Sequence, residues 1–204
     1  MNAITAYARL QALRVPVVTT SDAAAALGQS AFAASKTLVR LAVAGLVTPV
    51  RRGTWWLGRD LDPLRLPGFL TAPLPSYLSL HTALHVRGLI EQVPVVVYAV
   101  SLARTQRIVA GGTSFSIHHT APEIFGGFDE LPSGVLLATA EKALFDFAYL
   151  SGGRSRLFTS LPEVELPRGF RKRSIERWID RIPSQRGKTL TRKKIEALLA
   201  RATR

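Results

Sequence analysis

The chain has 204 residues, enough for one large domain or two small ones, and its 47% hydrophobic and 20% charged content describes a folded globular protein. It contains no cysteine, and its one methionine is the first residue, which excludes a disulfide scaffold, a cysteine-based zinc site and thiol catalysis. The formal net charge of +13 predicts a polyanionic partner.

The basic residues are concentrated at the two ends of the chain. Residues 1–58 hold six Lys and Arg against one acid, residues 59–150 hold six against eight, and residues 151–204 hold fifteen against five. A domain that is merely soluble more often mixes its charges throughout. The two ends are therefore expected to meet the partner.

Residues 1–58 predict three helices followed by a hairpin. A β-branched run leads into the second helix, with Thr20 or Ser21 as its N-cap and Gly28 as its stop, and Ser30 is placed to cap the third helix. The apolar stripe of the third helix recurs at helical spacing and consists of Ala31, Ala34, Leu38 and Leu41.

Two short strands then flank a turn at Arg51, Arg52 and Gly53, followed on the second strand by Trp55 and Trp56. Strand alternation places the two indoles on opposite faces. One is expected to pack against the helices and anchor the hairpin, and the other to face outward, where it supports an arginine or meets the linker. The sequence does not say which is which.

Three helices and a two-stranded wing form the order of a winged helix-turn-helix, whose third helix enters the major groove of DNA while the wing follows the backbone. Ser35 and Thr37 flank the face of the third helix opposite its apolar stripe and are candidates for phosphate contacts. The alternative is an ordinary solvated helix face. The predicted DNA-binding residues are Gln29, Ser30, Ala33, Lys36, Arg40, Arg51, Arg52 and Trp55.

Residues 59–68 contain two prolines and little periodicity, and are predicted to link this domain to a second one over residues 69–204. The second domain is expected to be mixed: a helical stripe from Leu78, a buried strand over 93–101, a hairpin turning at Gly111 and Gly112, and a helix in LLATAEKALFDFAYLS. Two basic amphipathic helices close the chain over about 170–204, the last with Thr191 as a possible cap. The predicted fold class is α/β (α+β).

Several segments resemble the AbiEi-type antitoxins of abortive-infection systems. They are TTSDAAAALGQSAFAASKTLVRLAVAGLVTPVRRGTWWLG, SYLSLHTALHVRGLIEQVP, VVVYAVS, FSIHHTAPEIFGG and GVLLATAEKALFDFAYLS, and ATAEKALFDF is the most specific of them. The resemblance covers roughly residues 15–150. It implies repression of the chain's own operon through the winged helix, antitoxin action through the C-terminal domain, and a nucleotidyltransferase-type toxin as partner.

The basic C-terminal residues have two functional interpretations: they extend the DNA footprint, or they dock an acidic toxin surface. The alternative is a passive basic surface. The residues concerned are Arg171, Lys172, Arg173, Arg177, Arg181, Arg186, Lys188, Arg192, Lys193 and Lys194.

No metal, cofactor or catalytic residue is predicted. His118 and His119 point to opposite faces of a strand and cannot hold one ion together, and the pair His81 and His85 lacks the glutamate of a metalloprotease motif. In ATAEKALFDF, the carboxylate–lysine pattern of a nuclease is not met, because Glu141 and Lys142 are adjacent on a helix. These two residues are expected to make helix-end and interface contacts, and Asp146 to pair with an arginine.

The sequence thus predicts a cytoplasmic antitoxin and autorepressor that is not an enzyme. Its start is expected to be an amphipathic helix rather than a signal peptide, and its most hydrophobic run, 93–100, is too short to span a bilayer. The alternatives are a stand-alone winged-helix regulator with a sensing C-terminal domain, and an interaction module that does not bind DNA.

Overall fold

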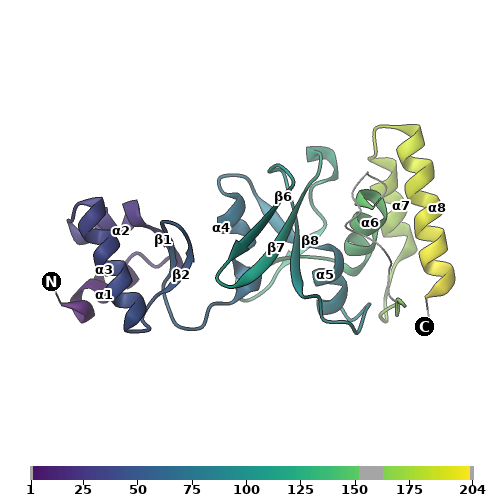
Figure 1. Ribbon diagram of the computed structural model, residues 1–204. Helices are drawn as coiled ribbons and strands as arrows, with labels where there is room; N and C mark the ends of the chain where they lie inside the picture. Colours follow the sequence, from purple (N-terminus) through teal and green to yellow (C-terminus); the bar gives the residue numbers. More distant parts are fainter. Residues whose placement is uncertain (1, 152–162, 203–204) are drawn as a thin grey trace. The chain divides into compact units, whose positions relative to one another are not determined.

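The computed structural model describes residues 2–151 and 163–202 (Figure 1). The fold is mixed α/β, as predicted, with one sheet in each of two compact units. The first unit consists of Met1–Pro63 with Val109–Thr113, and the second of Leu64–Ile108 with Ser114–Arg204.

The first unit contains the three predicted helices and a three-stranded antiparallel sheet. The sheet has the order β1-β3-β2, so the β-branched run before the second helix is a third strand that pairs with the hairpin. Ala34, Leu38 and Leu41 enclose the core together with Leu10 of the first helix. The elements are α1 (Ala3–Gln11), β1 (Val17–Thr19), α2 (Thr20–Leu27), α3 (Ala31–Val43), β2 (Thr48–Arg51) and β3 (Thr54–Trp56).

Helix α2 begins one residue earlier than predicted. Thr19, not Thr20 or Ser21, is its N-cap: the Thr19 hydroxyl accepts the backbone N–H of Asp22 at 3.1 Å, and the Asp22 carboxylate accepts the backbone N–H of Thr19 at 2.8 Å. This reciprocal capping box uses the acid at the third helical position, a signal that the sequence carries. Gly28 ends the helix in the left-handed conformation, as predicted.

Trp55 and Trp56 of the β2–β3 hairpin are both buried, so the expectation of an exposed indole is wrong. The expected alternative, that the second indole meets the chain leading into the linker, agrees with the structure. Trp55 packs into the helical core, and its indole N–H donates to the Thr20 hydroxyl at 3.3 Å. Trp56 is only 4% exposed on the other face, where the chain leaving β3 covers it: a Cβ on Gly58 would lie 3.3 Å from its Nε1. The two indoles do lie on opposite faces of β3, but both faces of this small sheet are covered.

The division between the units, at Pro63 and Leu64, lies inside the predicted linker 59–68. The ends of that linker belong to the units themselves. Arg59 donates from Nε to the carbonyl of Gly45 at 2.9 Å, and Pro67 begins a short helix. The connecting segment is therefore shorter than predicted.

The second unit is built on a six-stranded sheet of order β6-β7-β5-β4-β9-β8. Strand β4 runs antiparallel to β5 and parallel to β9, and β5 runs parallel to β7, so segments far apart in sequence lie side by side. The strands are β4 (Ser76–Leu78), β5 (Val96–Ser101), β6 (Gln106–Ala110), β7 (Thr113–His119), β8 (Phe128–Glu130) and β9 (Leu136–Ala138).

Helix α6 is the centre of the helical part of this unit, because α5, α7 and α8 all pack against it. The α-helices are α4 (Pro67–Thr71), α5 (Leu80–Val86), α6 (Ala140–Leu150), α7 (Lys172–Asp180) and α8 (Gln185–Arg201), with 3-10 turns at Pro63–Arg65 and Pro122–Ile124.

Three of the predicted helices begin at other residues than expected. The helix expected over LLATAEKALFDFAYLS begins only at Ala140, because Leu136–Ala138 form β9. Leu78 belongs to strand β4, and α5 starts only at Leu80. Helix α8 starts at Gln185 with Ser184 as its cap, and Thr191 lies buried in its interior.

The buried strand expected over 93–101 begins only at Val96, and Val93 and Val95 are exposed. The predicted hairpin at Gly111 and Gly112 is present between β6 and β7.

Candidate nucleic-acid interface

Helix α3 has one buried and one exposed face. Ser30 caps its start by accepting the backbone N–H of Ala33 at 3.3 Å, and this sets the phase of the helix. The buried face consists of Ala34, Thr37, Leu38 and Leu41, whereas Ala31, predicted as part of the stripe, is exposed. The exposed face consists of Phe32, Lys36, Val39, Arg40 and Val43.

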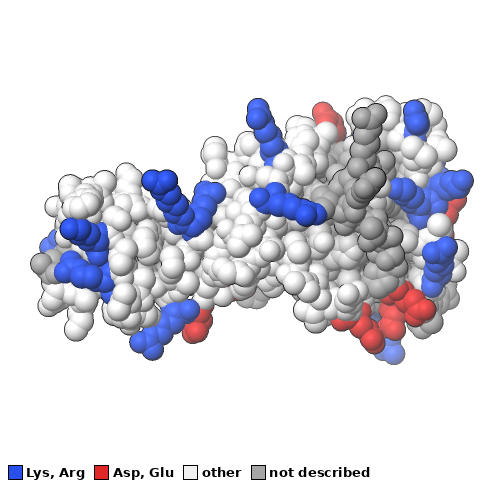
Figure 2. Space-filling model, viewed as in Figure 1, with Lys and Arg blue, Asp and Glu red and all other residues white. Residues whose placement is uncertain are grey.

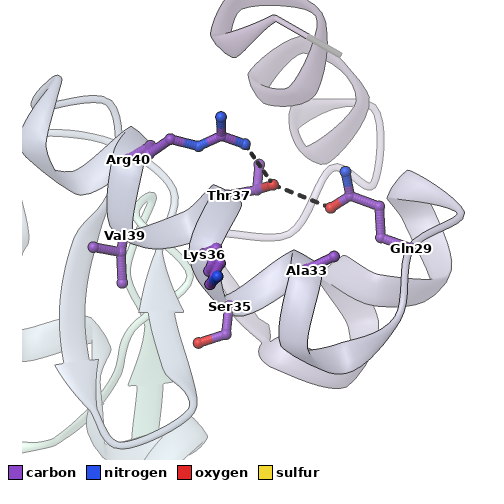
Figure 3. A pocket seen from close by; sticks show the side chains of 7 residues that line it. All are labelled: Gln29, Ala33, Ser35, Lys36, Thr37, Val39 and Arg40. Carbon is purple, nitrogen blue, oxygen red and sulfur yellow. Dashed lines mark hydrogen bonds between the residues drawn. The ribbon is translucent and has the colours of Figure 1, made fainter.

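A hollow of about 530 Å³ lies along the polar side of this helix (Figure 3). A chain of hydrogen bonds crosses it: Arg40 donates from Nη2 to the Thr37 hydroxyl at 3.3 Å, and this hydroxyl donates to Oε1 of Gln29 at 3.1 Å. The predicted phosphate contact of Thr37 is wrong, because the side chain is only 4% exposed and its hydroxyl is used inside the protein. The structure brings together Gln29, Ala33, Ser35, Lys36, Thr37, Val39 and Arg40.

Phe32 is the residue of this face that the sequence reasoning missed. Its ring is 71% exposed, and the Lys36 ammonium lies 4.4 Å from the ring centroid. A helix places residues four apart on one side, so the spacing to Lys36 already carried the signal. The face therefore combines cations with an exposed aromatic ring.

Arg51 and Arg52 lie exposed at the turn between β2 and β3, where Gly53 adopts φ +74°. Trp55 is buried, and its indole N–H anchors the turn to α2 through the Thr20 hydroxyl. Its ring is therefore not part of the exposed surface, and its role in DNA binding stays a prediction.

The surface of the first unit is basic. Asp22 is the one acid before Asp60 in the sequence, and its carboxylate is used in the capping box of α2. On the face that Figure 2 shows, basic side chains project from several points of this unit and acidic ones are sparse. An anionic partner would meet little repulsion there.

The basic residues predicted on the C-terminal helices have different surroundings in the structure. Arg192 pairs with Glu176 at 3.0 Å, and Lys194 donates to the Ser151 hydroxyl at 3.1 Å, where burial lowers its pKa. The other members include the half-buried Lys188 and the exposed Lys172, Arg173, Arg186 and Lys193. The remaining three, Arg171, Arg177 and Arg181, line a separate hollow on α7.

The histidines lie as their spacing predicted. His118 is buried and His119 exposed, on opposite faces of β7. Burial, with Arg107 and His81 nearby, lowers the pKa of His118 to about 4. Across residues 2–151 and 163–202, no three His, Asp or Glu side chains come close enough to hold a metal ion.

The prediction that Asp146 pairs with an arginine is wrong. Its carboxylate pairs with Lys142, one helical turn earlier. Both side chains are fully buried. The carboxylate also accepts the hydroxyls of Tyr77 at 2.9 Å and Ser79 at 2.7 Å, and Lys142 donates to Tyr77 at 2.8 Å. Burial lowers the pKa of Lys142, while the Asp146 carboxylate opposes that shift. Glu141 accepts the backbone N–H of Arg171 at 2.8 Å, a contact between α6 and α7 within the chain. The interface contact expected of Lys142 is wrong, because its side chain is fully buried.

Comparison of the chain with protein-family models and with curated protein sequences finds no match. Among the described helices, none has both the length and the apolar character needed to cross a membrane.

Proposed function

We propose that the chain is a cytoplasmic DNA-binding protein that represses its own operon and acts as the antitoxin of a nucleotidyltransferase-type toxin. The observation that carries the DNA-binding part is the exposed face of α3, with Lys36 and Arg40, in the same unit as the exposed turn with Arg51 and Arg52. The proposal includes no catalytic step.

The first unit is proposed to act as a winged helix-turn-helix. The element order α1-β1-α2-α3-β2-β3 agrees with this assignment, as does the tight packing of α2 on α3. Helix α3 enters the major groove, and the turn at Arg51 and Arg52 lies along the phosphates.

Affinity and choice of sequence come from different side chains. Arg51 and Arg52 contact phosphates, which supply affinity without sequence information. Lys36 and Arg40 donate to guanine edges, and Phe32 meets thymine methyl groups. The hydrogen bond to Thr37 restrains Arg40 before DNA arrives, which lowers the entropy lost on binding.

The test is fluorescence anisotropy of the full chain with a duplex from its own upstream region and a scrambled duplex, over a series of salt concentrations. We expect the wild type to prefer its own duplex and to weaken steeply with salt. Arg51→Ala/Arg52→Ala should lower the slope of log K against log salt by about 2, one phosphate contact for each arginine.

The matched control is Arg9→Ala/Arg14→Ala, which removes the same charge from exposed positions on and after α1. Its slope should stay close to that of the wild type. Equal losses in both variants would mean that net charge, not the wing, accounts for binding. A wild type that binds both duplexes equally would overturn the proposed operator recognition.

The antitoxin part rests on the sequence resemblance of residues 15–150, not on site geometry. Its test is growth of cells that express the nucleotidyltransferase encoded beside this chain, with and without the chain. We expect rescue by the wild type, and also by the Arg51→Ala/Arg52→Ala variant, which should lose only repression. Absence of rescue would favour a stand-alone regulator with a sensing second unit.

A second candidate function is an interaction module that does not bind DNA. It is favoured by the apolar part of the same helix face, where Phe32 is 71%, Val39 50% and Val43 87% exposed. This candidate predicts no preference for the upstream duplex and rescue of growth that Phe32→Ser/Val43→Ser abolishes. The DNA-binding proposal predicts that this variant still rescues.

A further inference from the structure

A second hollow, of about 410 Å³, lies within the second unit between α7, the start of α6 and the segment before β8. Three arginines, two hydroxyl side chains and one acid surround it. The lining residues are Gly127, Thr139, Glu141, Arg171, Ser174, Arg177, Trp178 and Arg181.

The three arginines that line the hollow, Arg171, Arg177 and Arg181, are exposed and have no acidic partner in the part of the chain that the structure describes. Arg177 donates from Nη2 to the Ser174 hydroxyl at 3.2 Å, and the Arg181 guanidinium carbon lies 4.4 Å from the centroid of the Trp178 ring. The protein thus orients these donors but leaves their charge unneutralised.

The charge at the start of α7 is the reverse of what a helix favours. Arg171 occupies the N-cap position without a capping hydrogen bond from its side chain, Lys172 and Arg173 follow, and the first turn contains no acid. The N-terminus of a helix carries partial positive charge, so cations there are destabilising. A bound anion would relieve this repulsion, and nothing in the helix itself does.

The Glu141 carboxylate offsets part of this charge, because its Oε1 accepts the backbone N–H of Arg171 at 2.8 Å at the start of α7. It forms no ion pair with any of the three guanidinium groups. With three arginines and one glutamate, the lining keeps a formal charge of +2.

We propose that this hollow binds a phosphomonoester of a small organic molecule. A phosphomonoester carries a charge of about −1.5 to −2 at pH 7, which matches the lining. The planar fork of arginine donates two parallel hydrogen bonds to phosphate oxygens, and the hydroxyls of Thr139 and Ser174 offer two further donors. The hollow is larger than a phosphoryl group and falls within the usual range of ligand pockets, so the organic part is held as well.

The test is isothermal titration of the full chain with AMP, a phosphomonoester, and with cyclic AMP, a diester of the same nucleoside. We expect AMP to bind about tenfold more tightly or better, because only the monoester offers the second charge. Arg177→Gln/Arg181→Gln should weaken AMP by about tenfold or more. The matched control is Arg186→Gln/Lys193→Gln, which removes two exposed charges of α8 outside the hollow and should leave AMP binding unchanged.

Inorganic phosphate and a DNA duplex without terminal phosphates distinguish the sources of the phosphoryl group. Phosphate should compete with AMP, and the duplex should not. Any of three results overturns the proposal. AMP and cyclic AMP could bind with equal affinity, the two variants could lose equal affinity for AMP, or titration with AMP could release no heat of binding. A duplex that displaces AMP would also overturn it, because the hollow would then be part of a DNA surface. None of these results depends on whether the first unit binds DNA.

Discussion

The buried pair of Lys142 and Asp146 allows a sharp test of what stabilises the second unit. In Asp146→Asn the side chain keeps its shape but loses its charge, while Lys142 stays fully buried beside it. Removing one partner of a buried ion pair costs about 3–5 kcal/mol, because the remaining charge is uncompensated. We expect the free energy of unfolding of this unit to fall by that amount.

Replacing both charges should be less damaging than replacing one. In Lys142→Met/Asp146→Leu no buried charge remains, and replacing a buried pair by apolar side chains is neutral or favourable by about 1–4 kcal/mol. The hydroxyls of Tyr77 and Ser79 would however lose the carboxylate that accepts them, at about 1–3 kcal/mol each. With the middle of each range, about 2 kcal/mol gained against about 4 kcal/mol lost, the double variant should be about 2 kcal/mol less stable than the wild type, compared with about 4 kcal/mol for Asp146→Asn.

The assay is urea unfolding of the full chain followed by circular dichroism and fitted to separate transitions of the two units. Two results would refute the reasoning. One is a free energy of unfolding of the second unit in Asp146→Asn that stays within about 1 kcal/mol of the wild type. The other is a double variant that is no more stable than Asp146→Asn.

Three further outcomes follow. Burial lowers the pKa of His118 to about 4, below the 6.5 of an unfolded histidine. Between these two values the unfolded state binds more protons, so the free energy of unfolding falls as the pH drops through them, by about 3 kcal/mol at most. Urea unfolding at pH 7 and pH 4.5 should show a smaller loss in His118→Gln than in the wild type. Gly127→Ala should destabilise the second unit, because the residue has φ +74° and the new Cβ would lie 2.6 Å from Cζ2 of Trp178. Gly134→Ala, at a similar φ but with open space around it, should lower the melting temperature less when both variants are compared in thermal melts. Phe32→Ala should weaken the upstream duplex more than the scrambled one in anisotropy, and equal weakening would remove Phe32 from base recognition.

Sequence reasoning succeeded where the signal was local. The caps Ser30 and Gly28, the hairpin at Gly111 and Gly112, and the helix in ATAEKALFDF depend on neighbouring residues, and all are present. The N-cap of α2 was predicted one or two residues too late because only the hydroxyl side chains were considered. Asp22, three residues after Thr19, completes a capping box and identifies Thr19 as the cap.

The strand pairings could not be predicted in the same way. Strands β4, β8 and β9 have three residues each, too few to show a period, and their partners lie far away in the sequence. The parallel pairing of β5 with β7 likewise depends on the sheet as a whole. The burial of Trp56 has the same origin, since its cover is chain that follows the strand.

In the candidate sites, the sequence predicted residue types better than their partners. The exposure of the basic residues on α3 and at the β2–β3 turn could be predicted from helical and strand periodicity alone. The contacts of Thr37 with Gln29, of Asp146 with Tyr77 and of Lys194 with Ser151 were not predicted, because the tertiary fold brings these side chains within reach. The pairing of Asp146 with Lys142 follows helical spacing, so the sequence already carried that signal. A polar residue on a helix is therefore placed by its period, but its role depends on what packs over it.

The segment ATAEKALFDF illustrates the same point and links the buried pair to the second hollow. Its charged residues are occupied with packing: Lys142 and Asp146 join α6 to Tyr77 of β4, and the Lys142 ammonium lies 4.7 Å from the centroid of the Trp178 ring. Trp178 in turn contacts Arg181. If the pair positions α7, Asp146→Asn should weaken AMP binding while Lys142→Met/Asp146→Leu restores part of it. An AMP affinity that is unchanged in a folded Asp146→Asn protein would separate the hollow from the pair and leave the segment with a purely structural role.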